Sequence, residues 1–154
     1  MFYFNHEYFM SKAIDLANIS YSEKEVPVGS VIVKDNMIIA MGRNRRELSK
    51  NALLHAEITA INNACEYLER WRLSGCTLYV TLEPCPMCAG AIINSRIDTL
   101  VFGAYDKKAG ASGSVINLFD YPFNHKPQII SQVLQHECSS LLSSFFLKLR
   151  NKSL

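Results

Sequence analysis

Two short segments of the chain contain residue types that bind zinc and carry protons. The first, Leu54-His55-Ala56-Glu57-Ile58, offers an imidazole and a carboxylate. The second, Glu83-Pro84-Cys85-Pro86-Met87-Cys88, offers two thiols three residues apart. Catalytic zinc sites use three protein ligands and keep a fourth position for water. The sequence therefore predicts an open zinc site with His55, Cys85 and Cys88 as its ligands.

The same segments indicate which group moves protons. Two thiolates and a neutral imidazole cancel the charge of Zn²⁺, so water at such a site is acidified only partly and needs a base. Glu57 follows His55 closely enough to face the open position without being a ligand, so we expect it to be the catalytic residue. Glu83 ends a strand-like run, and we expect it to make structural hydrogen bonds. A closed, structural zinc site would need a fourth ligand from apolar positions where we expect core residues, namely Cys65, Cys76 or Cys138.

Hydrophobic periodicity predicts the elements that position these groups. Helices are expected after an Asn5 cap, over Leu54–Leu68, over Pro86–Ser95, and along a stripe from Cys138 to Leu149. Strands are expected at Ser30–Val33 and Met37–Met41, which form a hairpin, and at Cys76–Leu82, Asp98–Gly103 and Gln128–Ile130. A strand, a helix and a strand in succession imply a right-handed crossover with parallel pairing. We therefore expect one α/β domain over residues 1–154, with a mixed sheet covered by helices.

Composition narrows the class of protein. The chain has 154 residues, of which 49% are hydrophobic and 19% are charged, so it can build an ordinary core. A net charge of +2 does not by itself indicate a nucleic-acid binder. We find no apolar run of about 18 residues, so no membrane span is expected. The first ten residues do not resemble a secretory signal, so we expect a cytoplasmic location, where the five cysteines stay reduced.

His55-Ala56-Glu57 with Pro84-Cys85-Pro86-Met87-Cys88 resembles the H-x-E…P-C-x-x-C signature of the zinc-dependent cytidine/deoxycytidylate deaminase superfamily. Within it, the chain is most similar to the bacterial tRNA-specific adenosine deaminases. The similarity covers nearly the whole chain and includes Glu25–Gly29, Thr81–Arg96, Phe102–Ala104 and Gly110–Ser114. It implies a cytidine-deaminase-like three-layer α/β/α fold with a five-stranded mixed sheet, one zinc ion per subunit, and a homodimer.

The resemblance also implies a reaction, namely hydrolytic deamination of adenosine to inosine at wobble position 34 of tRNA. The substrate it implies is arginine tRNA with an ACG anticodon, bound through its anticodon loop. The substrate contacts carried over by position are Val28, Asn44, Leu82 and Asp106, and the backbone N–H of Ala56 is a further candidate for contact with the hydroxide or the base edge. We expect phosphate contacts from nearby cations, namely Arg45, Arg46, Lys107, Lys108 and Arg150. Family members usually have Asp-Pro-Thr-Ala before the histidine, where this chain has Asn51-Ala52-Leu53-Leu54, so the loop and the pocket edge are expected to differ.

Two other functions stay open from the sequence. A deaminase of free nucleobases or nucleotides, of guanine or cytosine type, would use the same zinc ligands and the same carboxylate. A non-catalytic, zinc-stabilised RNA-binding protein would have no use for Glu57 beside an open position. Among the aromatic residues, we expect Trp71 to pack in the core or at its edge, and Phe146 could reach the anticodon loop.

Overall fold

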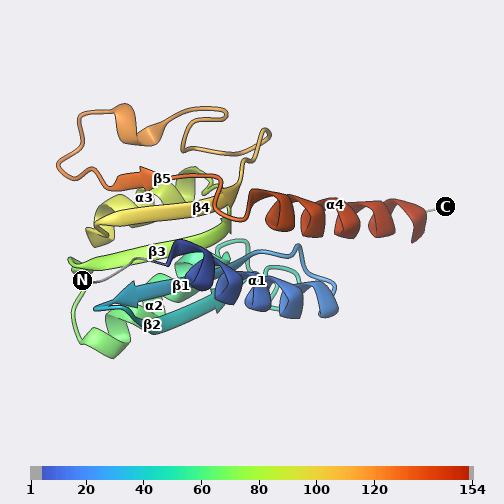
Figure 1. Cartoon of the computed structure of the whole chain (residues 1–154), viewed down its shortest axis with the longest axis horizontal. Helices are drawn as coiled ribbons and strands as arrows, with labels where there is room; N and C mark the ends of the chain where they lie inside the picture. The colour runs from blue at the N-terminus through green and yellow to red at the C-terminus, as the bar shows by residue number, and fades with distance from the viewer. Residues whose placement is uncertain (1–4, 153–154) are drawn as a thin grey trace.

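A computed structural model describes residues 5–152 of the chain (Figure 1). The predicted domain also includes residues 1–4 and 153–154, which lie outside the described part. The elements in chain order are α1 (His6–Ser22), β1 (Gly29–Lys34), β2 (Met37–Arg43), α2 (Ala56–Leu68), β3 (Cys76–Leu82), α3 (Pro86–Ser95), β4 (Thr99–Ala104), the 3-10 turn η1 (Leu118–Asp120), β5 (Gln128–Ile130) and α4 (Gln135–Lys152). Every strand and helix expected from the periodicity is present.

The five strands form one mixed sheet in the order β2-β1-β3-β4-β5. Strand β1 pairs antiparallel with both β2 and β3, whereas β3–β4 and β4–β5 are parallel. Asp35 and Asn36 join β1 to β2 with positive φ angles of 50° and 63°, as a two-residue hairpin turn requires. Helix α3 provides the crossover between the parallel strands β3 and β4. The predicted mixed five-stranded sheet is therefore confirmed.

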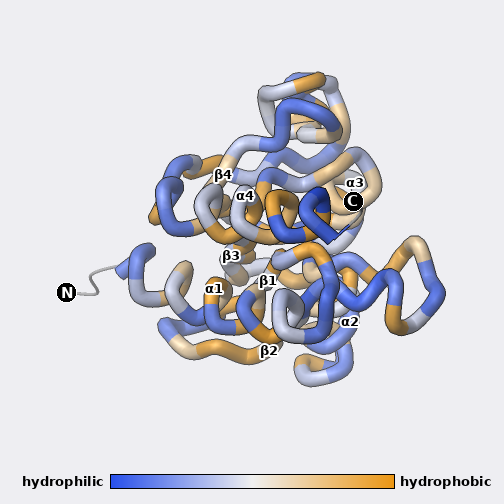
Figure 2. Tube along the Cα trace, turned by 90° about the vertical axis from the view of Figure 1, so that its right-hand side faces the viewer, coloured by the Kyte–Doolittle hydropathy of each residue, from blue (hydrophilic) through white to orange (hydrophobic). Residues whose placement is uncertain are grey.

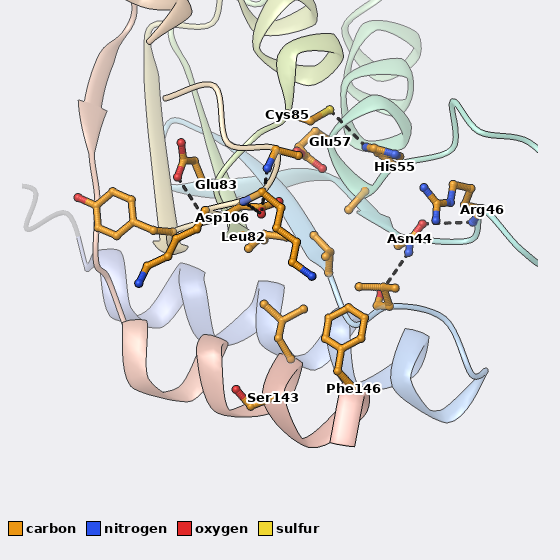
Figure 3. Close-up of a pocket in the computed structure, with 18 of the residues that line it drawn as sticks. Asn44, Arg46, His55, Glu57, Leu82, Glu83, Cys85, Asp106, Ser143 and Phe146 are labelled. Carbon is orange, nitrogen blue, oxygen red and sulfur yellow. Dashed lines mark hydrogen bonds between the residues drawn. The ribbon is translucent and has the colours of Figure 1, made fainter. Parts of the chain in front are cut away.

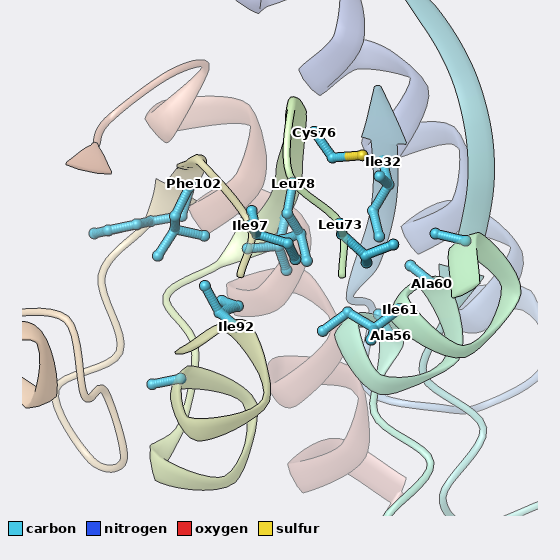
Figure 4. Close-up of a cluster of buried hydrophobic side chains, with 14 of the residues drawn as sticks. Ile32, Ala56, Ala60, Ile61, Leu73, Cys76, Leu78, Ile92, Ile97 and Phe102 are labelled. Atoms are coloured by element: carbon cyan, nitrogen blue, oxygen red, sulfur yellow. The ribbon is translucent and has the colours of Figure 1, made fainter. Parts of the chain in front are cut away.

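Helices cover both faces of the sheet, which gives the predicted three layers (Figure 1). Alternation along β1 shows how the sequence produces them, since successive strand residues point to opposite faces. Ile32 packs in the cluster with α2 and α3 (Figure 4), whereas Val31 and Val33 pack in the cluster with α1 and α4. Both faces of β1 are therefore buried in the core.

Close packing of α2 on the sheet fixes the depth of its first turn. A Cβ atom at Gly42 of β2 would overlap the backbone oxygen of Ala56 and the backbone nitrogen of Ala60. Only glycine allows the helix backbone to come this near the strand. His55 and Glu57 flank Ala56, so this contact helps to set where both side chains lie.

Helix α4 projects past the edge of the sheet toward the C-terminus (Figure 1), and Figure 2 looks along it from that end. Within the span of α4, only Cys138 and Phe145 are buried. The expected apolar stripe is therefore core only in part. The expectation for Trp71 was wrong: its side chain is 56% exposed, with the Arg72 guanidinium 4.6 Å from its ring centroid. Among residues 5–152, no helix combines the length and apolar character that crossing a bilayer requires.

Candidate metal centre and pocket

The predicted zinc ligands meet where two helices begin. His55 is the N-cap residue of α2, and Cys85 is the N-cap residue of α3. Cys88 lies in the first turn of α3, after Pro86, whose missing N–H suits this position. The N-terminal ends of both helices carry partial positive charge, which favours ionised thiols. The fold thus brings together ligands that are far apart in the chain.

The spacing of the three ligand atoms fits a tetrahedral metal ion. The Nδ1 atom of His55 lies 3.6 Å from the Sγ atoms of both Cys85 and Cys88. All three atoms lie within 4.8 Å of one another. In a tetrahedral zinc site with Zn–S of about 2.3 Å and Zn–N of about 2.05 Å, neighbouring nitrogen and sulfur ligands are roughly 3.5 Å apart. The cluster can therefore hold a metal ion, and its donor set is compatible with zinc.

The protein environment separates the ionisation of the two thiols. A hydrogen bond from Cys88, together with one from His55, lowers the pKa of the Cys85 thiol to about 4. The pKa of the Cys88 thiol is raised, because its hydrogen bond to Cys85 and its burial favour the protonated form. The hydrogen bond to Cys85 raises the pKa of the His55 imidazole. A divalent cation at this cluster would therefore displace a proton from Cys88.

Glu57 has the properties of a proton carrier. Its side chain is only 4% exposed, and burial raises the pKa of its carboxyl group to about 7. A hydrogen bond from its own backbone N–H and the charge of the nearby His55 both lower this pKa, but burial has the larger effect. A carboxyl group with a pKa near neutrality can both accept and donate a proton at physiological pH. Glu57 therefore has the burial and the pKa that general acid–base chemistry requires.

A cavity of about 800 Å³ opens beside this cluster (Figure 3). His55, Glu57 and Cys85 are among the residues that line it. All five predicted substrate contacts also line it, namely Val28, Asn44, Ala56, Leu82 and Asp106. So do four of the five cations predicted to contact RNA, namely Arg46, Lys107, Lys108 and Arg150. The exception is Arg45, which does not line the cavity and lies 3.9 Å from the Glu23 carboxylate.

The unusual lead-in to His55 does not line the cavity. Among residues 5–152, none of those lining the cavity comes from residues 47–54. The Leu53 side chain is exposed, and the Leu54 carbonyl accepts a hydrogen bond from the backbone N–H of Arg45. The leucines of this segment are therefore not part of the cavity lining.

Asn44 is held rigidly at the cavity wall. Its Nδ2 atom donates to the Val26 carbonyl at 3.1 Å, and its Oδ1 atom accepts from the Arg46 backbone N–H at 3.2 Å. The Ser20 hydroxyl donates to the Asn44 carbonyl. An amide nitrogen has two N–H groups, so one remains to meet a ligand. The residue is thus oriented before any substrate binds.

Two buried carboxylates fix the loops on either side of the cavity. Glu83 accepts hydrogen bonds from the backbone N–H groups of Asp106, Ser112 and Ser114 and from the Ser114 hydroxyl. The structural role expected for Glu83 is therefore confirmed. Glu25 does the same for the loop that follows β2, where it accepts hydrogen bonds from the backbone N–H groups of Glu47 and Leu48. These bonds hold in place the segments that carry Arg46, Lys107 and Lys108.

Sequence reasoning missed most of the wall that α4 supplies. Helix α4 contributes Leu142, Ser143, Phe146, Leu149 and Arg150 to the cavity. Only Phe146 and Arg150 were expected near substrate. The available signal was the length of the apolar stripe, which continues to Leu149, well beyond the part of α4 that packs against the sheet. Val26, Tyr105 and Ala109 were also missed, because nothing in their local sequence marks them.

Comparison with known proteins defines the class. The sequence profile of the MafB19-like deaminase family matches residues 4–150, and the chain belongs to this family. The tRNA-specific adenosine deaminase of Bacillus subtilis (strain 168) is 48% identical over 147 residues, which cover 95% of this chain and 91% of that protein. The corresponding protein of Haemophilus influenzae is 47% identical over 148 residues, covering 95% and 86%. The expected resemblance to bacterial tRNA-specific adenosine deaminases is confirmed.

A solved structure supports the same grouping. It comes from a study of A-to-I editing by tRNA:A34 deaminases at the wobble position of transfer RNA. The TM-score is 0.85 and the sequence identity is 42%, over 88% of this chain and 99% of the other. The predicted cytidine-deaminase-like fold is therefore confirmed, together with its assignment to an enzyme class.

Proposed function

We propose that this enzyme converts adenosine to inosine by hydrolysis at wobble position 34 of a tRNA, with zinc as its metal. The observation that carries the proposal is the position of buried Glu57 beside the His55, Cys85 and Cys88 cluster, in a cavity that is also lined by four cationic side chains. Two relatives at 47–48% identity are both named tRNA-specific adenosine deaminase, which supports tRNA as the substrate. We further propose arginine tRNA with an ACG anticodon as the particular substrate.

The chemistry assigns a distinct task to each group. When bound, zinc lowers the pKa of a water molecule and so supplies a nucleophile at neutral pH. His55, Cys85 and Cys88 would hold it. Glu57 accepts the proton that this water loses as its oxygen bonds to C6 of adenine, and delivers a proton to N1. A further proton transfer through Glu57 lets the amino group leave as ammonia, so adenosine and water give inosine and ammonia.

Other residues are placed to position the base. Asn44, with one free N–H, meets the edge of the base, while Val28 and Leu82 give an apolar surface for its ring. Ala56 lies beside His55 at the first turn of α2. An enzyme acting on a base inside a nucleic acid must receive that base flipped out of its stack. A tRNA anticodon loop offers such a base at low cost, since its bases are already unpaired.

The rim of the cavity suits an RNA better than a free nucleobase. Arg46 comes from one loop, Lys107 and Lys108 from another, and Arg150 from α4. Asp106 organises its own loop by accepting hydrogen bonds from the backbone N–H groups of Lys108 and Ala109. A free base has no phosphate for these cations, whereas the nucleotides on both sides of position 34 do. We therefore place the anticodon loop across this rim.

We also propose that the enzyme is a homodimer that works in the cytoplasm. Exposed apolar side chains gather on the segment after the Asp106 loop, namely Val115, Ile116, Tyr121 and Phe123. Single exposed apolar residues are common on protein surfaces, but a group of them in one segment is typical of an interface. The segment packs beside α3, so we place the dimer interface there. All five cysteines are unpaired, in keeping with a reducing compartment.

The decisive test is inosine formation in an anticodon stem–loop RNA with the sequence ACG, read by mass spectrometry of the digested nucleosides. The native protein should convert position 34, and Glu57→Gln should lower the rate by a factor of about 10² or more while it retains the metal. Free guanine and cytosine are assayed in parallel for ammonia release. Release from these bases with no inosine in the RNA would replace the proposal with the free-nucleobase alternative.

A further inference from the structure

The C-terminal half of α4 forms one wall of the substrate cavity although little else holds it in place. Its cavity-lining residues are Leu142, Ser143, Phe146, Leu149 and Arg150. Phe146 points from α4 into the cavity in Figure 3. The first turns are anchored by Cys138, which is buried against the sheet, but the later turns project past it (Figure 1). The position of this wall therefore depends on what touches its other side.

One residue of α1 makes that contact. The Tyr21 hydroxyl lies 3.0 Å from the Ser144 hydroxyl. The Tyr21 ring meets the Phe145 ring edge to face, with centroids 5.6 Å apart and planes at 75°. The Lys148 ammonium lies 5.2 Å from the centroid of the same ring. A single side chain thus engages three residues of α4 over more than one turn.

None of these three residues of α4 lines the cavity. With about 100° between successive residues of an α-helix, positions 142, 143, 146, 149 and 150 share one side. Ser144 and Lys148 fall on the opposite side, and Phe145 lies at the flank between the two sides. Tyr21 therefore supports α4 from behind, and any shift of α4 away from the cavity would meet this side chain.

Tyr21 also stands on a firmly held part of the molecule. Its neighbour Ser20 is fully buried and donates its hydroxyl proton to the Asn44 carbonyl at 2.8 Å. Just beyond the end of α1, buried Glu25 holds the backbone of Glu47 and Leu48. The last turn of α1 is thereby tied to the opposite wall of the cavity. The width of the cavity between Asn44 and α4 is set through this turn.

We propose that Tyr21 is a positioning residue that sets how α4 meets the RNA on either side of the reactive base. The inference rests on the proposed function, because it concerns binding of an RNA at the same cavity. Tyr21 does not line the cavity, so it has no part in the chemical step. Its loss should weaken RNA binding and leave the rate at saturation unchanged.

The test is steady-state deamination of the ACG stem–loop by Tyr21→Phe, Tyr21→Ala and Ser144→Ala. We expect KM to rise about threefold for Tyr21→Phe and Ser144→Ala, as the loss of one hydrogen bond implies. For Tyr21→Ala we expect about tenfold, since the contacts with Phe145 and Lys148 are lost as well. The kcat value should stay within about twofold of the native value in all three proteins.

A double mutant tests whether the two hydroxyl groups act as a pair. Tyr21→Phe combined with Ser144→Ala should raise KM no further than either change alone, because both remove the same hydrogen bond. Tyr8→Ala is the matched control. Tyr8 is an exposed tyrosine at the other end of α1, where it packs on Phe9 and lies 5.3 Å from the Lys12 ammonium. The Tyr8→Ala change should leave both KM and kcat unchanged.

The outcomes separate this inference from the proposed function. If the native protein forms no inosine in the stem–loop, the proposed function fails and the inference fails with it. If the native protein is active and Tyr21→Phe, Ser144→Ala and Tyr21→Ala all keep the native KM, only the inference is overturned. A fall in kcat at constant KM overturns it too, since Tyr21 would then act on the reaction itself. Should Tyr21→Ala not fold, the two milder variants decide.

Discussion

Gly110 lies directly against the buried carboxylate of Glu83. A Cβ atom at position 110 would overlap both the Glu83 carboxyl carbon and its Oε2 atom, and also the Asp106 carbonyl. The backbone and the acid therefore fit together only when residue 110 is glycine. The Glu83 carboxylate cannot move aside without losing the hydrogen bonds that hold the loop from Asp106 to Ser114.

We predict that Gly110→Ala displaces this loop and with it Lys107 and Lys108. Overpacking at such a site costs about 1–3 kcal/mol of unfolding free energy. Deamination of the stem–loop should fall by about tenfold or more, and thermal unfolding should occur at a lower temperature. Gly90→Ala is the matched control, because a Cβ atom there meets nothing within 4 Å. Inside helix α3, that change should be neutral or stabilise by up to about 1 kcal/mol.

Replacing a metal ligand should empty the site without unfolding the sheet. Cys85→Ala leaves two of three donors, so metal content measured by mass spectrometry should fall from about one ion per chain toward zero, and inosine formation should be lost. Cys65→Ala is the control, because Cys65 is also a half-buried thiol but lies far along α2 from the cluster. Equal metal content in Cys85→Ala and native protein would contradict the ligand assignment.

Ionisation of Glu57 should make the stability of the metal-free protein depend on pH. Its pKa is raised from 4.5 to about 7 in the folded protein, so folding favours the protonated form. The stabilisation is present below pH 4.5 and is lost as pH rises from 4.5 to 7. Over that range the native chain should lose up to about 3 kcal/mol relative to Glu57→Gln. Urea unfolding of both chelator-treated proteins at pH 5 and pH 8 measures the difference.

Salt should weaken RNA binding in proportion to the number of phosphate contacts. For single-stranded RNA, each contact contributes a slope of about −0.7 to the logarithm of affinity against the logarithm of salt concentration. Removing two cations in Lys107→Gln with Lys108→Gln should make the slope shallower by about 1.4. Lys34→Gln is the control, because Lys34 is the last residue of β1 and does not line the cavity. This change should leave the slope unaltered. An identical slope in all three proteins would show that the Asp106 loop does not contact phosphate.

Much of the site could be predicted because its residues form a dense local pattern. The sequence places His55 and Glu57 at one helix start and Cys85 and Cys88 at another, and helix starts are marked by caps and prolines. Parallel pairing of β3 and β4 then leaves little choice about where Cys85 lies. The residue types that bind zinc then identify the ligands. Glu57 could be assigned as the proton carrier because it lies two residues after the ligand His55.

The walls of the cavity could not be predicted in the same way. Periodicity shows that α4 has an apolar side, but it does not show whether the sheet or a ligand covers that side. Phe145 and Phe146 are adjacent and equally apolar, yet Phe145 is buried and Phe146 faces the cavity. Trp71 was misplaced for the same reason, since hydrophobicity does not reveal that Arg72 covers its ring. The supporting contacts of Glu25 and Tyr21 join distant segments, and such pairings leave no local signal.

The position of the metal cluster at the starts of α2 and α3 has a consequence for how the protein matures. Before the chain folds, Cys85 and Cys88 are close only to each other, and His55 joins them when α2 and α3 have both docked on the sheet. A metal ion held by all three therefore reports completed tertiary structure. Since binding favours only that state, the ion should slow the opening of the native protein rather than speed its formation. Metal uptake is thus the last step of folding, and the ion is released when the protein unfolds.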